Sequence, residues 1–139
     1  MKVLILTEGG ERIGFGHITR CVALCEAFKE KYPDIQPKIV TSFSMYYDLE
    51  DPVRFASDIS TVLDQDGMWI FEQSYLPAMI AANSFDTICH EHLEYYSTKI
   101  INRLLLKFEL RIFDHRYNDV NGGSSQYYIV HKNSKYKSN

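Results

Sequence analysis

The sequence predicts an α/β fold: a three-layer, Rossmann-like sheet that is mostly parallel and ends in a C-terminal antiparallel hairpin. Three observations support this prediction. Short apolar segments alternate with stretches in which apolar residues recur every three or four positions, as on a helix with one buried face. A glycine-rich loop joins the first apolar segment to the first helical stretch, as in nucleotide-binding α/β units. The last two apolar segments flank Asn121-Gly122-Gly123-Ser124, a sequence typical of a hairpin turn.

The first predicted elements are a strand, the glycine-rich loop and a helix. The strand covers Val3–Thr7 and the loop covers Glu8–Gly16. The helix begins near His17 and ends near Tyr32-Pro33, because apolar residues recur at helical spacing between these positions. The next apolar segment, Lys38–Phe43, is predicted to be a second strand.

A second helix is predicted directly after Asp51-Pro52, because aspartate is a good N-cap and proline fits the first helical turn. The expected buried stripe of this helix consists of Val53, Ala56, Ile59, Val62 and Leu63. After a turn at Asp66-Gly67, Met68–Phe71 is continuously apolar, as expected of a central parallel strand.

The second half of the chain is predicted to contain two helices and the closing hairpin. A short helix covers Pro77–Ala82, and a further apolar strand is expected just before His90-Glu91-His92. Ser97 is expected to cap a longer helix, whose inward side chains are Ile100, Ile101, Leu104, Leu105 and Phe108. The strands Leu110–Tyr117 and Gln126–His131 form the hairpin, which brings the sheet to about six strands.

The composition limits the class of protein. A chain of 139 residues with 45% hydrophobic and 14% aromatic content is long enough for one packed domain. A formal net charge of -3 gives no reason to expect nucleic acid or an anionic membrane as a partner. No apolar run approaches the ~20 residues that cross a bilayer, and the N-terminal apolar segment is too short for a signal peptide. We therefore expect a cytoplasmic protein without nucleic-acid or membrane partners.

His90-Glu91-His92 is the most distinctive sequence in the chain. Imidazole titrates near neutral pH, so two histidines around a carboxylate can move a proton. The same triplet in isolation is also compatible with a hydrogen-bonded loop without chemistry. A zinc site in which His115 or His131 joins the two histidines is a further alternative, but we expect no metal. Cys21, Cys25 and Cys89 are interpreted as reduced residues rather than as a disulfide framework.

Residues 38–132 resemble the second half of the S-adenosylmethionine-dependent sugar C-methyltransferases, class I methyltransferases that act on deoxysugars carried by a nucleoside diphosphate. The resemblance is carried by four ordered segments: Thr41–Pro52, Asp66–Tyr75, Phe85–Ser97 and Asn118–Ser124. The C-terminal hairpin agrees with it, because the last strand of that fold runs antiparallel to the others.

The resemblance implies roles for several residues. His92 resembles the general base that removes a proton from the sugar carbon beside a ketone, Glu91 would orient or polarise the site, and His90 would lie beside it. Many relatives carry tyrosine at the position of Cys89, so we expect Tyr95 or Tyr96 to supply a phenol in its place. Asn121, in the fourth segment, is a further candidate for substrate contact.

Residues 1–35 resemble the start of the UDP-sugar hydrolases of the pseudaminic-acid pathway, which belong to the two-Rossmann (GT-B) glycosyltransferase superfamily. The segments Glu8-Gly9-Gly10 and Ile13–Cys21 carry this resemblance, and His17 matches the histidine that activates water. The chain is therefore interpreted as a chimera or truncation with its junction between Tyr32 and Phe43. Within one domain of residues 1–132, residues 1–37 would be hydrolase-like and 38–132 methyltransferase-like, with residues 133–139 forming a disordered tail.

The leading hypothesis is a C-methyltransferase-like domain that binds S-adenosylmethionine and a nucleotide sugar and that a truncation could have left inactive. Its expected cofactor loop consists of Glu8, Gly9, Gly10, Gly14 and Gly16, since glycine permits close backbone approach. A UDP-sugar hydrolase that uses His17 is one alternative, and a folded protein without enzymatic activity is another. A sheet that lacks part of one side exposes an edge, so we also expect a homodimer.

Overall fold

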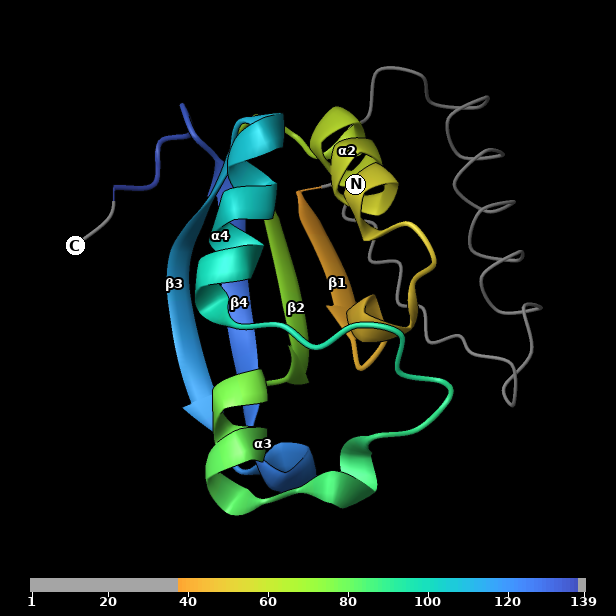
Figure 1. The fold of residues 1–139 in the computed structure, drawn as a ribbon. Helices are drawn as coiled ribbons and strands as arrows, with labels where there is room; N and C mark the ends of the chain where they lie inside the picture. Colours follow the sequence, from red (N-terminus) through yellow and green to blue (C-terminus); the bar gives the residue numbers. More distant parts are fainter. Residues whose placement is uncertain (1–37, 138–139) are drawn as a thin grey trace.

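The computed structural model describes residues 38–137 (Figure 1). The predictions made for the first part of the chain lie outside the described residues. They are the first strand, the helix after it, the cofactor loop of Glu8, Gly9, Gly10, Gly14 and Gly16, the substrate contact His17, and the hydrolase-like segment with its junction up to residue 37.

Residues 38–137 contain one sheet of four strands, in the order β1-β2-β4-β3. The strands are β1 (Ile39–Phe43), β2 (Met68–Ser74), β3 (Leu110–Asn118) and β4 (Ser124–His131). β1 and β2 are parallel, whereas β4 is antiparallel to both β2 and β3. The ends of β1, β2 and β3 and the start of β4 therefore meet at one edge of the sheet, which we call the carboxyl edge (Figure 1).

The described sheet is mixed, since β1, β2 and β3 run in one direction and β4 alone runs against them, as the predicted hairpin at the end of an otherwise parallel sheet requires. Only β1 and β2 pair in parallel there, because β4 inserts between β2 and β3 and forms two antiparallel pairs. The predicted C-terminal hairpin is confirmed. It is formed by β3 and β4, which are joined by the 3₁₀ turn η4 (Val120–Gly122).

The prediction of a strand just before His90-Glu91-His92 is wrong. The segment forms a 3₁₀ turn, η2 (Phe85–Thr87), in which the Thr87 hydroxyl donates to the Ser84 carbonyl (2.8 Å). Phe85 and Ile88 are 72% and 62% exposed. Their apolar side chains are an odd number of positions apart, so they could not share one face of a strand. Hydrogen bonds between near neighbours in the chain therefore hold this segment in a turn rather than in a strand.

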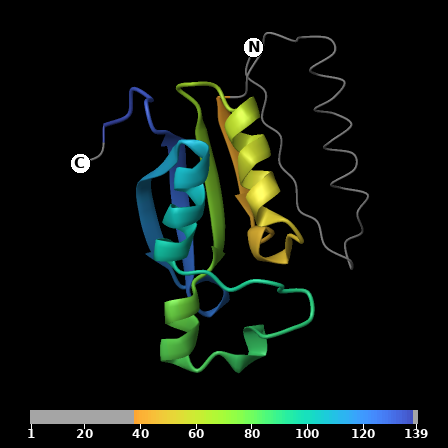
Figure 2. The ribbon, with the colours of Figure 1, turned by 45° about the horizontal axis from the view of Figure 1, so that its top comes forward.

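Three α-helices lie within residues 38–137: α2 (Pro52–Val62), α3 (Leu76–Ala82) and α4 (Thr98–Leu105). The predicted start of α2 is confirmed, since the Asp51 side chain accepts from the Arg54 amide at 2.8 Å. α2 and α4 lie side by side on one face of the sheet, and α3 lies beyond the carboxyl edge (Figures 1 and 2). The described helices α2 and α4 thus cover one face of the sheet, and the first predicted helix lies outside the described residues.

The core lies between the sheet and α2 and α4. It consists of Tyr46, Tyr47, Ala56, Ile59, Leu63, Trp69, Phe71, Tyr96, Ile101, Leu105, Leu110, Tyr127 and Ile129. The predicted helix stripes are largely confirmed, but Val53 and Ile100 are exposed. Phe55 packs against the core in place of Val53. On α4, Ile101 and Leu105 are one turn apart and define the buried face, which leaves Ile100 outside it.

The last described residues, 132–137, contact the rest of the domain. The Lys132 amide donates to the Glu109 carbonyl at 2.8 Å, and the Lys135 amide donates to the Asp66 carboxylate at 3.1 Å. Tyr136 packs against Phe113, with ring centroids 5.5 Å apart. None of the helices in residues 38–137 is long and apolar enough to span a membrane.

Candidate functional site

The His90-Glu91-His92 triplet lies on the connection between α3 and α4, which crosses the carboxyl edge (Figure 1). The connection is anchored at two points. The Leu93 and Glu94 amides both donate to the Tyr47 carbonyl, at 2.9 and 3.1 Å. Nearer to α4, the Leu76 amide donates to the Tyr96 carbonyl at 3.0 Å. The triplet is therefore held beside the chain that follows β1 and the chain that follows β2.

The 3₁₀ turn η1 (Tyr46–Asp48) brings the end of β1 to the triplet. Ser44, directly after β1, has a left-handed φ of 51°, which turns the chain away from the strand. Tyr46 is then buried and donates its hydroxyl to the Pro52 carbonyl at 2.9 Å. This turn places Tyr47 and Asp48 at the carboxyl edge.

The side chain of His92 is fixed by three neighbours. Its Nδ1 lies 2.8 Å from the Thr87 carbonyl oxygen. Its ring centroid lies 4.3 Å from that of Tyr47 and 6.4 Å from that of Tyr95. A carbonyl oxygen only accepts, so Nδ1 must carry the proton of the neutral ring, which leaves a lone pair on Nε2. The arrangement thus prepares Nε2 to accept a proton.

The Asp48 carboxyl lies close to His92 and Glu91, and its pKa is shifted. Burial raises the pKa of its carboxyl to about 6; His92 opposes the rise, whereas Glu91 adds to it. Its Oδ1 is buried and has no hydrogen-bond partner among residues 38–137. A carboxyl of this kind titrates in the same range as an unperturbed imidazole. The Asp48 carboxyl therefore changes its charge near neutral pH, close to His92 and Glu91.

Of the other two residues of the triplet, Glu91 is partly buried and His90 is exposed. Glu91 Oε1 is 3.8 Å from His90 Nε2, and the His90 side chain is 75% exposed. Among residues 38–137, no three or more His, Cys, Asp or Glu side chains are grouped as metal ligands. His131 lies at the opposite end of β4 and contacts the Leu63 carbonyl at 3.2 Å. The zinc alternative therefore finds no support in the described part of the chain.

The predicted substrate contacts fall in different surroundings. Tyr95 is half-buried, and its hydroxyl lies 3.4 Å from the Thr87 carbonyl that also binds His92. Tyr96 is part of the core, its ring 5.5 Å from Tyr46, and burial raises the pKa of its phenol. Tyr96 is thus buried, its hydroxyl has no hydrogen-bond partner among residues 38–137, and its substrate contact stays a prediction. Asn121 is exposed on η4.

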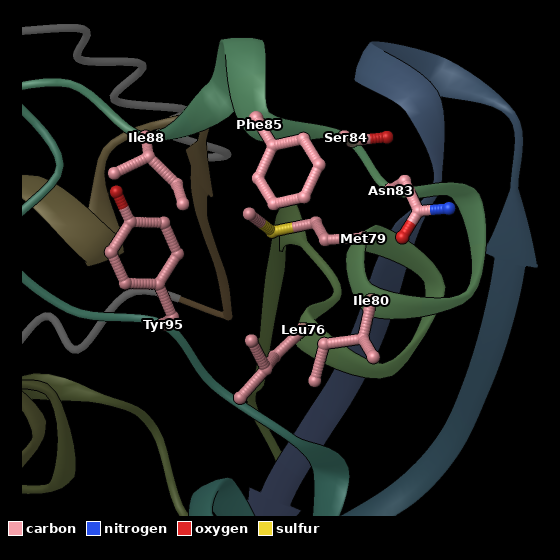
Figure 3. Close-up of a pocket in the computed structure, with 8 residues that line it drawn as sticks. All are labelled: Leu76, Met79, Ile80, Asn83, Ser84, Phe85, Ile88 and Tyr95. Carbon is pink, nitrogen blue, oxygen red and sulfur yellow. The ribbon is translucent and has the colours of Figure 1, made fainter.

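Two hollows lie beside α3. An apolar pocket of about 260 Å³ lies between α3 and the α3–α4 connection, with Met79, Phe85, Ile88 and Tyr95 around it (Figure 3). The side chains of Asn83 and Ser84 point away from its centre. An open groove of about 670 Å³ lies between α3 and η4 and includes Tyr75, Tyr117 and Asp119. Tyr95 is the residue that joins the apolar pocket to His92.

Tyr47 and Asp48 were missed by sequence reasoning as site residues. Both lie in the segment 41–52 that carries the family resemblance. They also follow a strand of a parallel pair, and ligands of α/β sheets commonly bind beyond the carboxyl ends of such strands. That rule would have identified both residues. The position of Thr87 has no comparable signal, because it is the backbone carbonyl that contacts His92.

The described residues have the fold of class I S-adenosylmethionine-dependent methyltransferases. A putative type 11 methyltransferase from Sulfolobus solfataricus aligns with 95% of this chain and 86% of its own, at a TM-score of 0.55 and 13% identity. LepI in complex with S-adenosylmethionine aligns with 94% of this chain and 43% of its own, at a TM-score of 0.61 and 12% identity. Magnesium protoporphyrin IX methyltransferase from Synechocystis PCC 6803, with bound SAH, aligns with 69% of this chain and 45% of its own. The TM-score is 0.53 and the sequence identity is 11%.

One relative is similar to this chain in sequence as well as in class of enzyme. The C-methyltransferase NovU of Streptomyces niveus is 32% identical to this chain over 87 residues, which is 63% of this chain. The chain spans about a fifth of the length of NovU, 21%. No family model matches the chain. The methyltransferase-like part of the sequence prediction is thus supported, whereas none of the relatives named here is a GT-B protein.

Proposed function

We propose that this chain is a C-methyltransferase domain that uses S-adenosylmethionine and acts on a carbon beside a ketone in a nucleotide-linked deoxysugar. The observation that carries the proposal is the hydrogen bond between His92 Nδ1 and the Thr87 carbonyl, which leaves Nε2 as the proton acceptor. The partial identity with NovU and the class I fold support the methyl-transfer chemistry. The sugar and its nucleotide come from the sequence resemblance.

The described residues suffice to account for proton removal. His92 Nε2 takes the proton from the carbon, and the electron pair of the broken C–H bond moves into the neighbouring carbonyl as an enolate. The imidazolium that forms lies close to the Asp48 carboxyl, whose ionised form stabilises it. Glu91 adds a carboxylate to the same surroundings. The enolate carbon is then the nucleophile for a methyl group.

S-adenosylmethionine, when bound, supplies that methyl group. The residues predicted to hold it, Glu8, Gly9, Gly10, Gly14 and Gly16, lie outside the described residues. Its fit is therefore a matter for direct measurement, and calorimetric titration of S-adenosylmethionine into the purified chain is the test. Binding in the micromolar range supports the cofactor assignment, and no heat at millimolar ligand contradicts it.

Exchange of the substrate proton with solvent deuterium tests the base. In D₂O, the parent protein is expected to exchange the hydrogen on the carbon beside the ketone of a nucleotide-linked keto-deoxysugar, and His92→Ala is expected to lose this activity. His115→Ala is the matched control, since His115 is exposed on β3. Unchanged exchange in a folded His92→Ala variant would remove the base assignment. Absence of exchange in the parent would favour the non-enzymatic alternative.

Homodimerisation is a further proposal, which follows from the expectation of an exposed sheet edge. Light scattering at micromolar concentration tests it. A dimer mass is the expected result, and a monomer mass would contradict it.

A further inference from the structure

Tyr47, on the turn η1, contacts the His92 segment with both its backbone carbonyl and its ring. The carbonyl of Tyr47 accepts two hydrogen bonds from consecutive amides of the α3–α4 connection, those of Leu93 and Glu94, at 2.9 and 3.1 Å. The Tyr47 side chain is 7% exposed and belongs to the core cluster. The part of the connection that follows His92 is therefore attached to a rigid element rather than to another loop.

The ring of Tyr47 also contacts the imidazole directly. The two ring centroids are 4.3 Å apart at an interplanar angle of 54°. Together with the Thr87 carbonyl at Nδ1 and the edge of Tyr95, this contact restricts rotation of the imidazole about both side-chain torsions. A base must be oriented as well as basic, because small displacements of reacting groups reduce rates steeply.

We propose that Tyr47 is a positioning residue for His92. Its ring and backbone carbonyl hold the imidazole against the Thr87 carbonyl, which favours the Nδ1–H tautomer and leaves Nε2 available to the substrate. This inference rests on the proposed role of His92 as base. Tyr47 acts through its ring and its carbonyl rather than through its phenol. Burial raises the pKa of that phenol, so its proton stays in place over the working range of pH.

The charged and titratable groups around His92 come from two elements. Asp48 lies on η1, and Glu91, Cys89 and Tyr95 lie on the connection itself. A substitution of Tyr47 changes none of these side chains. An effect on the His92 tautomer would therefore report the position of the ring rather than a change in local charge.

The first test is NMR of the full chain with ¹⁵N-labelled histidine, without substrate. Long-range ¹H–¹⁵N spectra at a pH where imidazoles are neutral distinguish the two tautomers. The parent is expected to show His92 as Nδ1–H, with its ring protons shifted upfield by the Tyr47 ring. A parent His92 in the Nε2–H form, or without that upfield shift, would overturn the proposal regardless of any variant.

The second test compares Tyr47→Phe with Tyr47→Met, which both lack the phenol but differ in the ring. Tyr47→Phe is expected to keep the tautomer, the upfield shift and the parent rate of solvent exchange. Tyr47→Met is expected to lose the upfield shift, to populate both tautomers, and to slow exchange roughly ten- to hundredfold with a smaller change in KM. A folded Tyr47→Met variant with the parent tautomer and rate would overturn the proposal.

The two proposals fail in different ways. If the parent shows the Nδ1–H tautomer but no solvent exchange, the proposed function fails whereas the positioning of the imidazole by Tyr47 stands as a structural result. If exchange occurs and depends on His92 but Tyr47→Met leaves the tautomer unchanged, only the positioning role fails. Circular dichroism of each variant establishes that it is folded before either conclusion is drawn.

Discussion

Two buried side chains on the helix-covered face of the sheet and one at the carboxyl edge differ in how their polar atoms are hydrogen-bonded. On the helix-covered face, the buried Trp69 indole N–H donates to the Ser42 hydroxyl at 2.9 Å, and the buried Tyr46 hydroxyl donates to the Pro52 carbonyl at 2.9 Å. At the carboxyl edge, Asp48 Oδ1 is buried without a hydrogen-bond partner in the described part of the chain. Trp69 and Tyr46 thus use their polar groups in internal hydrogen bonds, whereas the Asp48 carboxyl at the carboxyl edge keeps an unpaired oxygen.

This difference separates stability from chemistry. Buried polar groups that are paired stabilise a fold, whereas unpaired ones cost free energy and are commonly kept for a function. Substitutions on the helix-covered face should therefore change the free energy of unfolding, whereas substitutions at the carboxyl edge should change activity or its pH dependence. The following predictions test that separation.

The largest expected effect is that of Trp69→Ala. Trp69 is fully buried against Phe71 and Tyr46, with ring centroids at 4.7 and 5.7 Å, so its removal leaves a large cavity. We expect a loss of about 3–5 kcal/mol in the free energy of unfolding, measured by urea denaturation followed by circular dichroism. Trp69→Phe is the control and should cost about 1–2 kcal/mol, because it leaves the Ser42 hydroxyl without its partner. A loss below about 1 kcal/mol for Trp69→Ala would contradict the assigned core.

Gly123→Ala should have the next largest effect, because Gly123 joins the two regions. It has a φ of 123°, and an added Cβ would lie 2.6 Å from the Ala78 Cβ of α3. We expect a loss of about 2 kcal/mol from strain and from displacement of α3, measured by urea denaturation. Gly122→Ala is the matched control, since its φ is 76° but its added Cβ would lie 3.4 Å from the Ser84 hydroxyl. Equal losses in both variants would show that packing against α3 is unimportant.

The sequence predicted the helix-covered face well because local patterns determine it. The apolar run at Met68–Phe71 and the cap at Asp51-Pro52 each define an element without reference to distant residues. The pairing of the strands was predicted less well. The insertion of β4 between β2 and β3 joins residues far apart in the chain, such as Phe71 and Tyr127, and no local pattern encodes it.

The carboxyl edge was predicted only in part for the same reason. His92 was identified from its residue type and its resemblance, but Tyr47 contacts it from a turn that is distant in sequence. Tyr95 and Tyr96 are neighbours of one type, yet one lies beside the apolar pocket and the other in the core. Which of two adjacent tyrosines is buried depends on the path of the α3–α4 connection. That path is set by backbone hydrogen bonds that the sequence pattern does not reveal.

Asp51→Ala should have a smaller effect, confined to the helix-covered face. The Asp51 carboxylate caps α2 through the Arg54 amide, and loss of such a cap costs about 1 kcal/mol. Thermal unfolding should show a modest decrease in midpoint, and Asp51→Ser should restore most of it because serine also caps helices. A decrease in solvent exchange at constant stability would contradict the separation of the two regions.

The smallest expected effect on stability is that of Asp48→Asn, and its size depends on pH. Because burial raises the pKa of Asp48 from 3.8 to about 6, the folded state holds the carboxyl proton more tightly than the unfolded state does. The contribution of Asp48 to the free energy of unfolding is therefore fully present below pH 3.8, and it is lost as the pH rises through about 6. Asparagine has a similar shape and does not ionise.

The stability of Asp48→Asn relative to the parent should consequently increase as the pH is raised from about 4 to about 8. We expect a gain on the order of 1 kcal/mol or less, since partial exposure of the carboxyl reduces the effect of burial. The same variant should slow His92-dependent exchange, because the imidazolium loses its neighbouring carboxylate. Urea denaturation at both pH values and the exchange assay measure the two effects. A variant that is more stable at high pH and less active would show that the carboxyl edge retains an ionised Asp48 at the expense of stability.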